Sequence, residues 1–165
     1  MLRPFGPSHE APARAAASAF QGSGFDFLPF DFVATMPWAE WTALMERHRH
    51  GIDLPENRVR GAFLAADVDG QLVGRASIRF ELNDFLSNRG GHIGYGVLPA
   101  FRRRGYATAI LKQSIEIARN EGVSNILVAC DDSNVASAKV IERCGGVLED
   151  ITFDDEGVGF RRYWI

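Results

Sequence analysis

The stretch that most constrains the fold runs from residue 90 to residue 107. A glycine-spaced apolar segment reaches Pro99, arginines follow at 102–104, and Gly105 opens a long amphipathic helix. Free backbone N–H groups at a helix N-terminus attract an anion, and the helix dipole strengthens that attraction. Arginine side chains add charge-assisted hydrogen bonds, and glycine lets the backbone approach a ligand closely. The stretch therefore predicts a strand that leads into a phosphate-binding turn.

The rest of the chain predicts a mixed α/β fold. Apolar residues recur at three- and four-residue spacings in residues 36–50 and 105–120, as in amphipathic helices. Asp69-Gly70 predicts a tight hairpin between strands at 61–68 and 72–82. Further strands are expected at 2–5, 92–98, 125–130, 147–153 and 158–164, and further helices at 11–20 (capped by Ser8) and 135–144. This order predicts a mixed sheet with helices on its faces, including a right-handed βαβ unit over residues 92–130.

Composition narrows the class of protein. A chain of 165 residues with 46% hydrophobic and 24% charged residues is typical of one soluble globular domain, expected over residues 1–165. The net charge of −3 favours neither nucleic acid nor an anionic membrane as a partner. Two cysteines make neither a disulfide framework nor a metal-ligand set, so no metal is expected. The first residues lack the apolar run of a signal peptide, and no membrane-length stretch follows, so the expected location is cytoplasmic.

Four motifs in order carry a resemblance to a known family. Residues 97–99 read Val-Leu-Pro, and residues 102–107 fit the pattern Arg/Gln-x-x-Gly-x-Gly/Ala. About 30 residues on, the spacing of a βαβ unit, residues 134–137 read Asn-Val-Ala-Ser and residues 142–146 read Glu-Arg-Cys-Gly-Gly. These motifs resemble those of the Gcn5-related N-acetyltransferases (GNAT), and the likeness covers nearly the whole chain.

A finer likeness concerns a bacterial subgroup of that family described as predicted acetyltransferases. It rests on the glycine-rich residues 90–96, on Arg79-x-x-Leu82-Asn83 and on the closing residues 162–165. The resemblance implies a GNAT-like fold: a mixed, mostly antiparallel sheet with a central splayed pair of parallel strands and helices on both faces. The splayed strands would be those at 92–98 and 125–130.

The resemblance also implies acetyl-coenzyme A (acetyl-CoA) as co-substrate, bound in the V-shaped opening between the splayed strands. The pantetheine would pair with the main chain at 95–97, the pyrophosphate would lie over residues 103–108, and Asn134 would hold the far side. The glycines at 94 and 96 would permit a bulge that opens the sheet. The expected cofactor-binding residues are Tyr95, Gly96, Val97, Arg102, Arg103, Arg104, Gly105, Tyr106, Ala107, Thr108, Asn134 and Ser137.

The catalytic residues are less constrained. The glutamate and tyrosine that many family members use would fall at Ala129 and Ile141, so both usual roles are vacant. His92 is the leading candidate base because its unperturbed pKa is near neutral, although a structural hydrogen bond between strands explains it equally well. Glu81 is the second candidate, against the alternative of a solvated carboxylate at a strand end.

The resemblance implies transfer of an acetyl group to a primary amine of a small molecule or peptide. The alternative is a non-catalytic sensor that binds acyl-CoA, which the two vacant positions motivate. Aromatic residues at 25, 27, 30, 32, 38 and 41 either wall the acceptor pocket or, for the tryptophans at helical spacing, pack in the core. A homodimer formed through the final hairpin is suggested by fold analogy alone.

Overall fold

The structure is a computed structural model that describes residues 1–22, 24–28 and 32–165. Its strands form two antiparallel sheets rather than one. The first sheet has the order β1 (Leu2–Pro4), β2 (Gly61–Val68), β3 (Gln71–Arg79) and β4 (Ile93–Val97). The second has the order β5 (Leu127–Asp131), β7 (Gly159–Trp164) and β6 (Val147–Phe153). β4 and β5, at facing edges of the two sheets, are joined through a helix, as the predicted βαβ unit requires.

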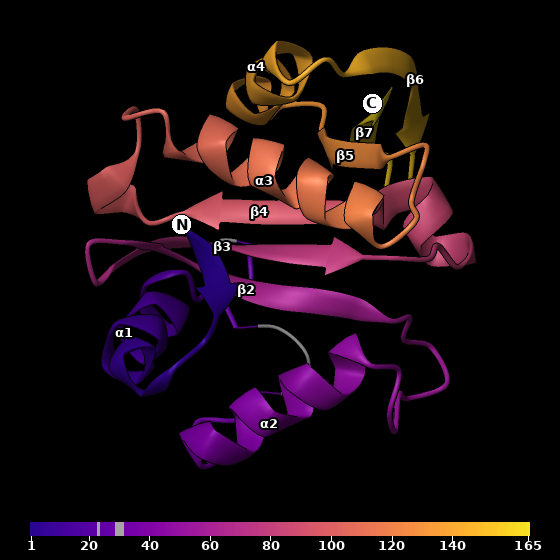
Figure 1. Cartoon of the computed structure of the whole chain (residues 1–165). Coiled ribbons are helices and arrows are strands. Elements are labelled where there is room, and N and C mark those ends of the chain that lie inside the picture. Colours follow the sequence, from indigo (N-terminus) through magenta and orange to yellow (C-terminus); the bar gives the residue numbers. More distant parts are fainter. Residues whose placement is uncertain (23, 29–31) are drawn as a thin grey trace.

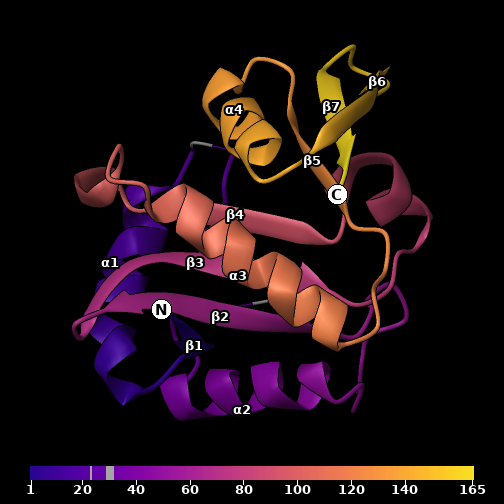
Figure 2. The same cartoon turned by 45° about the horizontal axis from the view of Figure 1, so that its top comes forward.

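Helices cover both faces of the first sheet. The helices are α1 (Glu10–Ala19), α2 (Trp38–Arg49), α3 (Tyr106–Asn120) and α4 (Val135–Arg143), with short helical turns at Pro7–His9, Leu86–Gly90 and Pro99–Phe101. Figure 1 shows α3 lying across β3 and β4, with α1 and α2 on the opposite side of the sheet. The turned view in Figure 2 places α4 beside the second sheet. The fold class predicted from the sequence is confirmed.

The two faces of the first sheet have separate hydrophobic cores. On the α3 face, Ile110 and Leu111 are fully buried against strand residues such as Ile78. On the α1 and α2 face, an aromatic cluster joins Trp41 to Phe63 of β2. Because side chains alternate along a strand, β3 contributes to both environments.

Polar residues on β3 are placed on the α1 and α2 face. Ala76 and Ile78 pack in the α3 core, and the residues between and beside them, Arg75, Ser77 and Arg79, project to the other side. The guanidinium of Arg75 lies 5.4 Å from the centre of the Phe63 ring on that side. Three polar side chains therefore project from an interior strand toward α2.

Several predicted boundaries need correction. The strand predicted over residues 72–82 ends at Arg79, because the Asn83 side chain accepts a hydrogen bond from the Leu86 N–H (3.0 Å) and starts a π-helical turn. Ser8 does not cap α1: it lies inside a short 3₁₀ turn, and the His9 side chain accepts from the Gly6 N–H (2.9 Å) instead.

Within the described residues, no helix is both long and apolar enough to cross a membrane. The same residues hold no group of three or more His, Cys, Asp or Glu side chains arranged to bind a metal ion.

Candidate active site

The two sheets meet at a single backbone junction beside His92. The His92 N–H donates to the Leu127 carbonyl (2.7 Å), and the Leu127 N–H donates to Nδ1 of the His92 ring (2.9 Å). In the described part of the chain, no other backbone hydrogen bond joins β4 to β5. The strands therefore separate beyond His92, as the splayed arrangement requires.

Gly91 makes the close approach at this junction feasible. Its φ angle is 63°, in the left-handed region that favours glycine. A Cβ atom at this position would lie only 2.7 Å from the Leu127 carbonyl oxygen. Position 91 therefore has two independent requirements for glycine.

One edge of β4 is open. The Arg79 N–H donates to the His92 carbonyl (2.7 Å) and the Leu98 N–H donates to the Val73 carbonyl (2.9 Å), so the even-numbered residues bond to β3. In an antiparallel ladder the intervening residues point their N–H and C=O groups the other way. The backbone groups of Tyr95 and Val97 therefore face the gap between the sheets.

The expected bulge in β4 is not present. The β3–β4 register runs from Gly74↔Val97 to Ile78↔Ile93 without a shift. The glycines serve close side-chain contacts instead: a Cβ at Gly96 would collide with the ring of Phe25, and one at Gly94 would touch the guanidinium of Arg79 at 3.5 Å. The sheet opens because β5 diverges from β4, and not because β4 is distorted.

The N-terminus of α3 borders the gap. The first helical hydrogen bond runs from the Ala109 N–H to the Gly105 carbonyl (3.1 Å), so the N–H groups at 105–108 have no acceptor within the helix. Gly105 has φ 83° and nothing within 4 Å of where a Cβ would stand. Arg103 also has a positive φ, 62°, and its side chain is exposed. This turn has the features of the predicted anion site.

The neighbouring arginines differ in their contacts. Arg102 donates from Nε to the Val97 carbonyl (3.3 Å) and so braces the turn against the end of β4. The Arg104 guanidinium lies 5.8 Å from the centre of the Phe101 ring. Of the three, Arg103 is the one whose side chain has no contact of this kind within the described residues.

The start of α4 forms the other wall of the gap. Asn134 Oδ1 accepts from the Ser137 N–H (3.0 Å) and caps the helix. The Tyr95 hydroxyl shares a 2.8 Å hydrogen bond with Ser137 Oγ and links β4 to α4. Burial raises the pKa of Tyr95 to about 12, so its phenol stays protonated at neutral pH. Tyr95 and Ser137, both predicted at the cofactor site, are thus brought together.

His92 is buried, with 6% of its surface exposed. Burial is the main cause that lowers its pKa below the ordinary 6.5, and the nearby positive charge of Arg79 acts in the same direction. A neutral ring whose Nδ1 accepts a hydrogen bond carries its proton on Nε2. In this form neither ring nitrogen has a free lone pair for a substrate proton.

Glu81 lies just past the end of β3 with 66% of its side chain exposed, 4.0 Å from Arg60. It does not line the cavity described below. At the two vacant positions, Ile141 is fully buried in the α3 core and Ala129 is a half-buried residue of β5.

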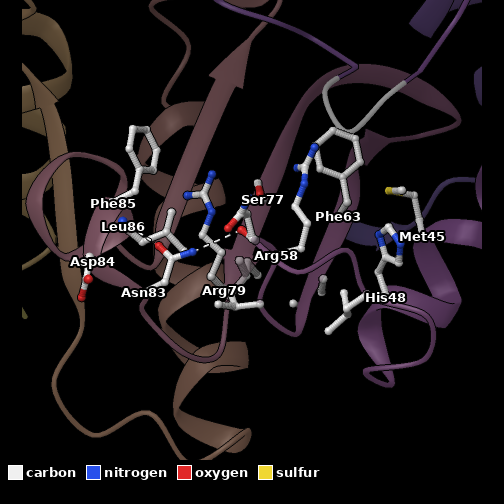
Figure 3. Close-up of a pocket in the computed structure, with 16 residues that line it drawn as sticks. Met45, His48, Arg58, Phe63, Ser77, Arg79, Asn83, Asp84, Phe85 and Leu86 are labelled. Atoms are coloured by element: carbon white, nitrogen blue, oxygen red, sulfur yellow. Dashed lines mark hydrogen bonds between the residues drawn. The ribbon is translucent and has the colours of Figure 1, made fainter.

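A cavity of about 590 Å³ opens on the α2 side of the first sheet (Figure 3). Its walls come from α2, the loop before β2, the ends of β2 and β3, and the segment 83–86. The polar lining residues Arg58, Ser77 and Arg79 were missed as site residues in the sequence. The alternation of polar and apolar residues from Arg75 to Arg79 is a signal that indicates Ser77 and Arg79, and it does not extend to Arg58.

Most of the aromatic residues pack in the core. Trp41 and Phe27 are almost completely buried, and Trp38 stacks at a tilt on Trp41 with 4.8 Å between ring centres. Phe25 instead lies over β4 and carries the Arg75 guanidinium 4.2 Å from its ring centre. Phe30 lies outside the described residues.

Comparison with known proteins identifies the family. The model of the acetyltransferase (GNAT) family matches residues 30–146. The chain therefore belongs to the GNAT acetyltransferases and is an enzyme of the acyltransferase class. This membership favours an enzyme over the sensor that the sequence left as an alternative. Comparison with curated protein sequences gives no significant match.

Solved structures share the fold. The chain is similar to yncA from Salmonella typhimurium, solved with its cofactor acetyl-CoA (TM-score 0.65, 16% identity, 100% of this chain and 92% of that one). It is also similar to the ribosomal-protein-alanine N-acetyltransferase of Brucella melitensis (TM-score 0.66, 17% identity, 100% of this chain and 98% of that one). A third similar structure is a mutant of spermidine N-acetyltransferase SpeG from Vibrio cholerae (TM-score 0.65, 14% identity, 100% of this chain and 94% of that one).

Proposed function

We propose that this enzyme transfers the acetyl group of acetyl-CoA to a primary amine. The observation that carries the proposal is the gap between β4 and β5. The N–H groups of Tyr95 and Val97, on one edge of β4, have no backbone partner within the described residues. This edge leads to a helix N-terminus whose first four N–H groups have no acceptor within the helix. Acetyl-CoA has the matching chemistry, because an amide-containing arm ends in a pyrophosphate.

The residues present fit this co-substrate. The open edge of β4 would pair with the amides of the pantetheine arm, as an added strand does. Residues 103–108 would hold the pyrophosphate through main-chain N–H groups, and Gly105 leaves the space above the turn clear. Asn134, the exposed N-cap of α4, is the residue that would hold the co-substrate on the far side.

When bound, acetyl-CoA supplies an activated thioester, and the chain must then position the amine and polarise the carbonyl. The main-chain N–H of Val97, at the open edge, is the candidate donor to that carbonyl. His92 and Glu81 remain predictions as catalytic groups. The Nδ1 hydrogen bond of His92 supports the structural reading of that residue, and the exposure of Glu81 supports a solvated carboxylate.

Thermal unfolding with coenzyme A tests the co-substrate. Millimolar coenzyme A or acetyl-CoA is expected to raise the melting temperature of the wild-type protein, because a ligand that binds only the folded state stabilises it. Gly105→Trp is expected to abolish this shift, since the indole would fill the open space above the turn and the amides there could no longer reach a phosphate.

Gly122→Trp is the matched control. Gly122 also has a positive φ, 93°, and open space around its missing Cβ, but it follows the C-terminus of α3. Both variants therefore have comparable backbone strain, and only the first lies at the proposed site. An equal ligand shift in wild type and Gly105→Trp, or no shift in the wild type, would contradict the proposal.

A further inference from the structure

Arginine side chains predominate among the charged residues that the structure describes on the lining of the cavity beside β3. Its titratable lining residues are His48, Arg58, Arg79 and Asp84. Figure 3 shows the guanidinium groups of Arg58 and Arg79 extending to the same side, with Ser77 between them, and the Asp84 carboxylate turned away. The pKa of Arg79 is lowered to about 10 by burial and by the positive charge of Arg58. An anion placed here would stabilise the charged form of Arg79 and so oppose both effects.

The Arg79 guanidinium has hydrogen-bond donors that are not used by the fold in the described part of the chain. Its Nη1 donates weakly to the carbonyls of Gly90 (3.4 Å) and Gly91 (3.3 Å), which fixes the side chain at the junction of the sheets. Nε and Nη2 have no partner within the described residues, and neither has the hydroxyl of the buried Ser77. These atoms are donors without acceptors, on the wall of a cavity.

The neighbouring Arg75 shows the contrast. It projects from the same face of β3, but its two terminal nitrogens donate to the carbonyls of Asp26 (2.7 Å) and Gly94 (3.4 Å). Arg75 is therefore already used in joining the 24–28 segment to the sheet. Arg79, four residues along the strand, is left to bind a ligand.

The position of Arg79 relates the cavity to the proposed acetyl site. A Cβ at Gly94 would lie 3.5 Å from Nη1 and 3.9 Å from Nη2 of Arg79. The guanidinium thus lies over Gly94, whose neighbour Tyr95 presents its backbone to the gap. A group held by Arg79 would be within a few atoms of an acetyl group carried at that edge.

From these contacts we infer that the acceptor is a free amino acid, whose carboxylate is bound by Arg79 with help from Ser77 and Arg58. This inference rests on the proposed function and names its acceptor class. The planar guanidinium has two adjacent donors that match a carboxylate. In an α-amino acid the amine is one carbon away from that carboxylate, which suits the short separation between Arg79 and the open edge of β4.

The rest of the cavity selects for an apolar side chain. Most of its other lining residues are hydrophobic, among them Met45, Leu54, Val59, Phe63 and Leu86. A cavity of about 590 Å³ is within the usual range for sites that enclose a small molecule. L-phenylalanine is therefore a suitable probe, together with its amide and with 2-phenylethylamine, which lacks the carboxylate.

Calorimetric titration of the coenzyme A complex tests the inference without requiring turnover. L-phenylalanine is expected to bind at least about tenfold more tightly than 2-phenylethylamine or L-phenylalaninamide, as loss of a charge-assisted hydrogen-bond pair predicts. Arg79→Met is expected to remove that preference. Arg60→Met is the control, because Arg60 is bound to Glu121 (2.8 Å) and does not line the cavity.

Each other outcome has a defined meaning. Equal affinity of the wild-type complex for the three amines overturns the inference. An Arg79→Met variant that weakens all three equally also overturns it, because Arg79 would then act on the fold or the co-substrate. If Arg79→Met does not fold, Arg58→Met is used, and it must reduce the preference for L-phenylalanine. A failure of coenzyme A itself to bind is seen before any amine is added, and counts against the proposed function alone.

Discussion

At the scale of single residues, the His92 side chain links the two sheets through a hydrogen bond. Its ring occupies the place of a backbone acceptor and receives the Leu127 N–H at 2.9 Å. Loss of the ring would leave that N–H buried without a partner, a cost of about 1–3 kcal/mol. We therefore expect His92→Ala to lower the free energy of unfolding by this amount, measured by urea denaturation.

His92→Asn separates the two roles of the residue. The amide oxygen of asparagine can stand near the position of Nδ1, so this variant is expected to recover most of the lost stability. The turnover rate of His92→Asn then distinguishes a catalytic role of His92 from a structural one. Loss of activity with restored stability would identify His92 as the base, and retained activity would identify it as the junction between the sheets.

The pH dependence of stability has a defined sign. The folded state lowers the pKa of His92, mainly through burial, so below pH 6.5 the unfolded state binds the extra proton more readily. This contribution to stability is fully present above pH 6.5 and is lost as the pH falls through the folded pKa. Urea denaturation between pH 5 and 7 is expected to show a weaker pH dependence for His92→Asn than for wild type.

At the scale of elements, β4 has two unequal edges. Alternation assigns the N–H groups of Gly94 and Gly96 to β3 and those of Tyr95 and Val97 to the gap. Amide hydrogen exchange is expected to be fast at Tyr95 and Val97 in the free protein and slow at the two glycines. Acetyl-CoA should slow the first pair and leave the second unchanged. Equal protection of all four amides in the free protein would contradict the open edge.

The order and kind of elements could be predicted from the sequence because periodicity and turn residues are local signals. The helices at 38–49 and 106–120 and the hairpin at Asp69-Gly70 follow from such signals. The π-helical turn at 86–90 could not be predicted, since it depends on the Asn83 side chain and on the junction at Gly91. The bulge expected in β4 was wrong because glycine there serves tertiary contacts with Phe25 and Arg79.

The two parts of the candidate site, the phosphate turn and the cavity, differ in how well they could be predicted from the sequence. The predicted phosphate turn is a contiguous motif, so residues 102–108 could be proposed from the sequence as an anion site. The cavity is assembled from four separate segments, and no local pattern states that Arg58 and Arg79 meet. Only the alternation of polar residues on β3 indicates that the face of this strand toward α1 and α2 has a role other than core packing.

At the scale of the whole molecule, the two sheets depend on their junction. Gly91→Ala is expected to destabilise the protein by about 1–3 kcal/mol, because a Cβ would press on the Leu127 carbonyl in addition to straining the backbone. Gly70→Ala is the comparison, since Gly70 has a similar φ of 80° but open space around it. Urea denaturation should show the larger loss for Gly91→Ala. Equal losses would mean that the contact with β5 contributes nothing.

The open strand edge also has a consequence for how such an enzyme can diversify. If the donor binds through main-chain groups as proposed, its recognition does not depend on side-chain identity, and mutations on the face of β4 and β3 that points to the cavity would leave the donor contacts intact. In the two proposals above, the donor would contact the main chain of β4 and the acceptor would contact side chains of the neighbouring strand β3. A lineage built on this scaffold is free to exchange one acceptor for another by altering positions such as 77, 79 and 94 while its donor chemistry stays constant.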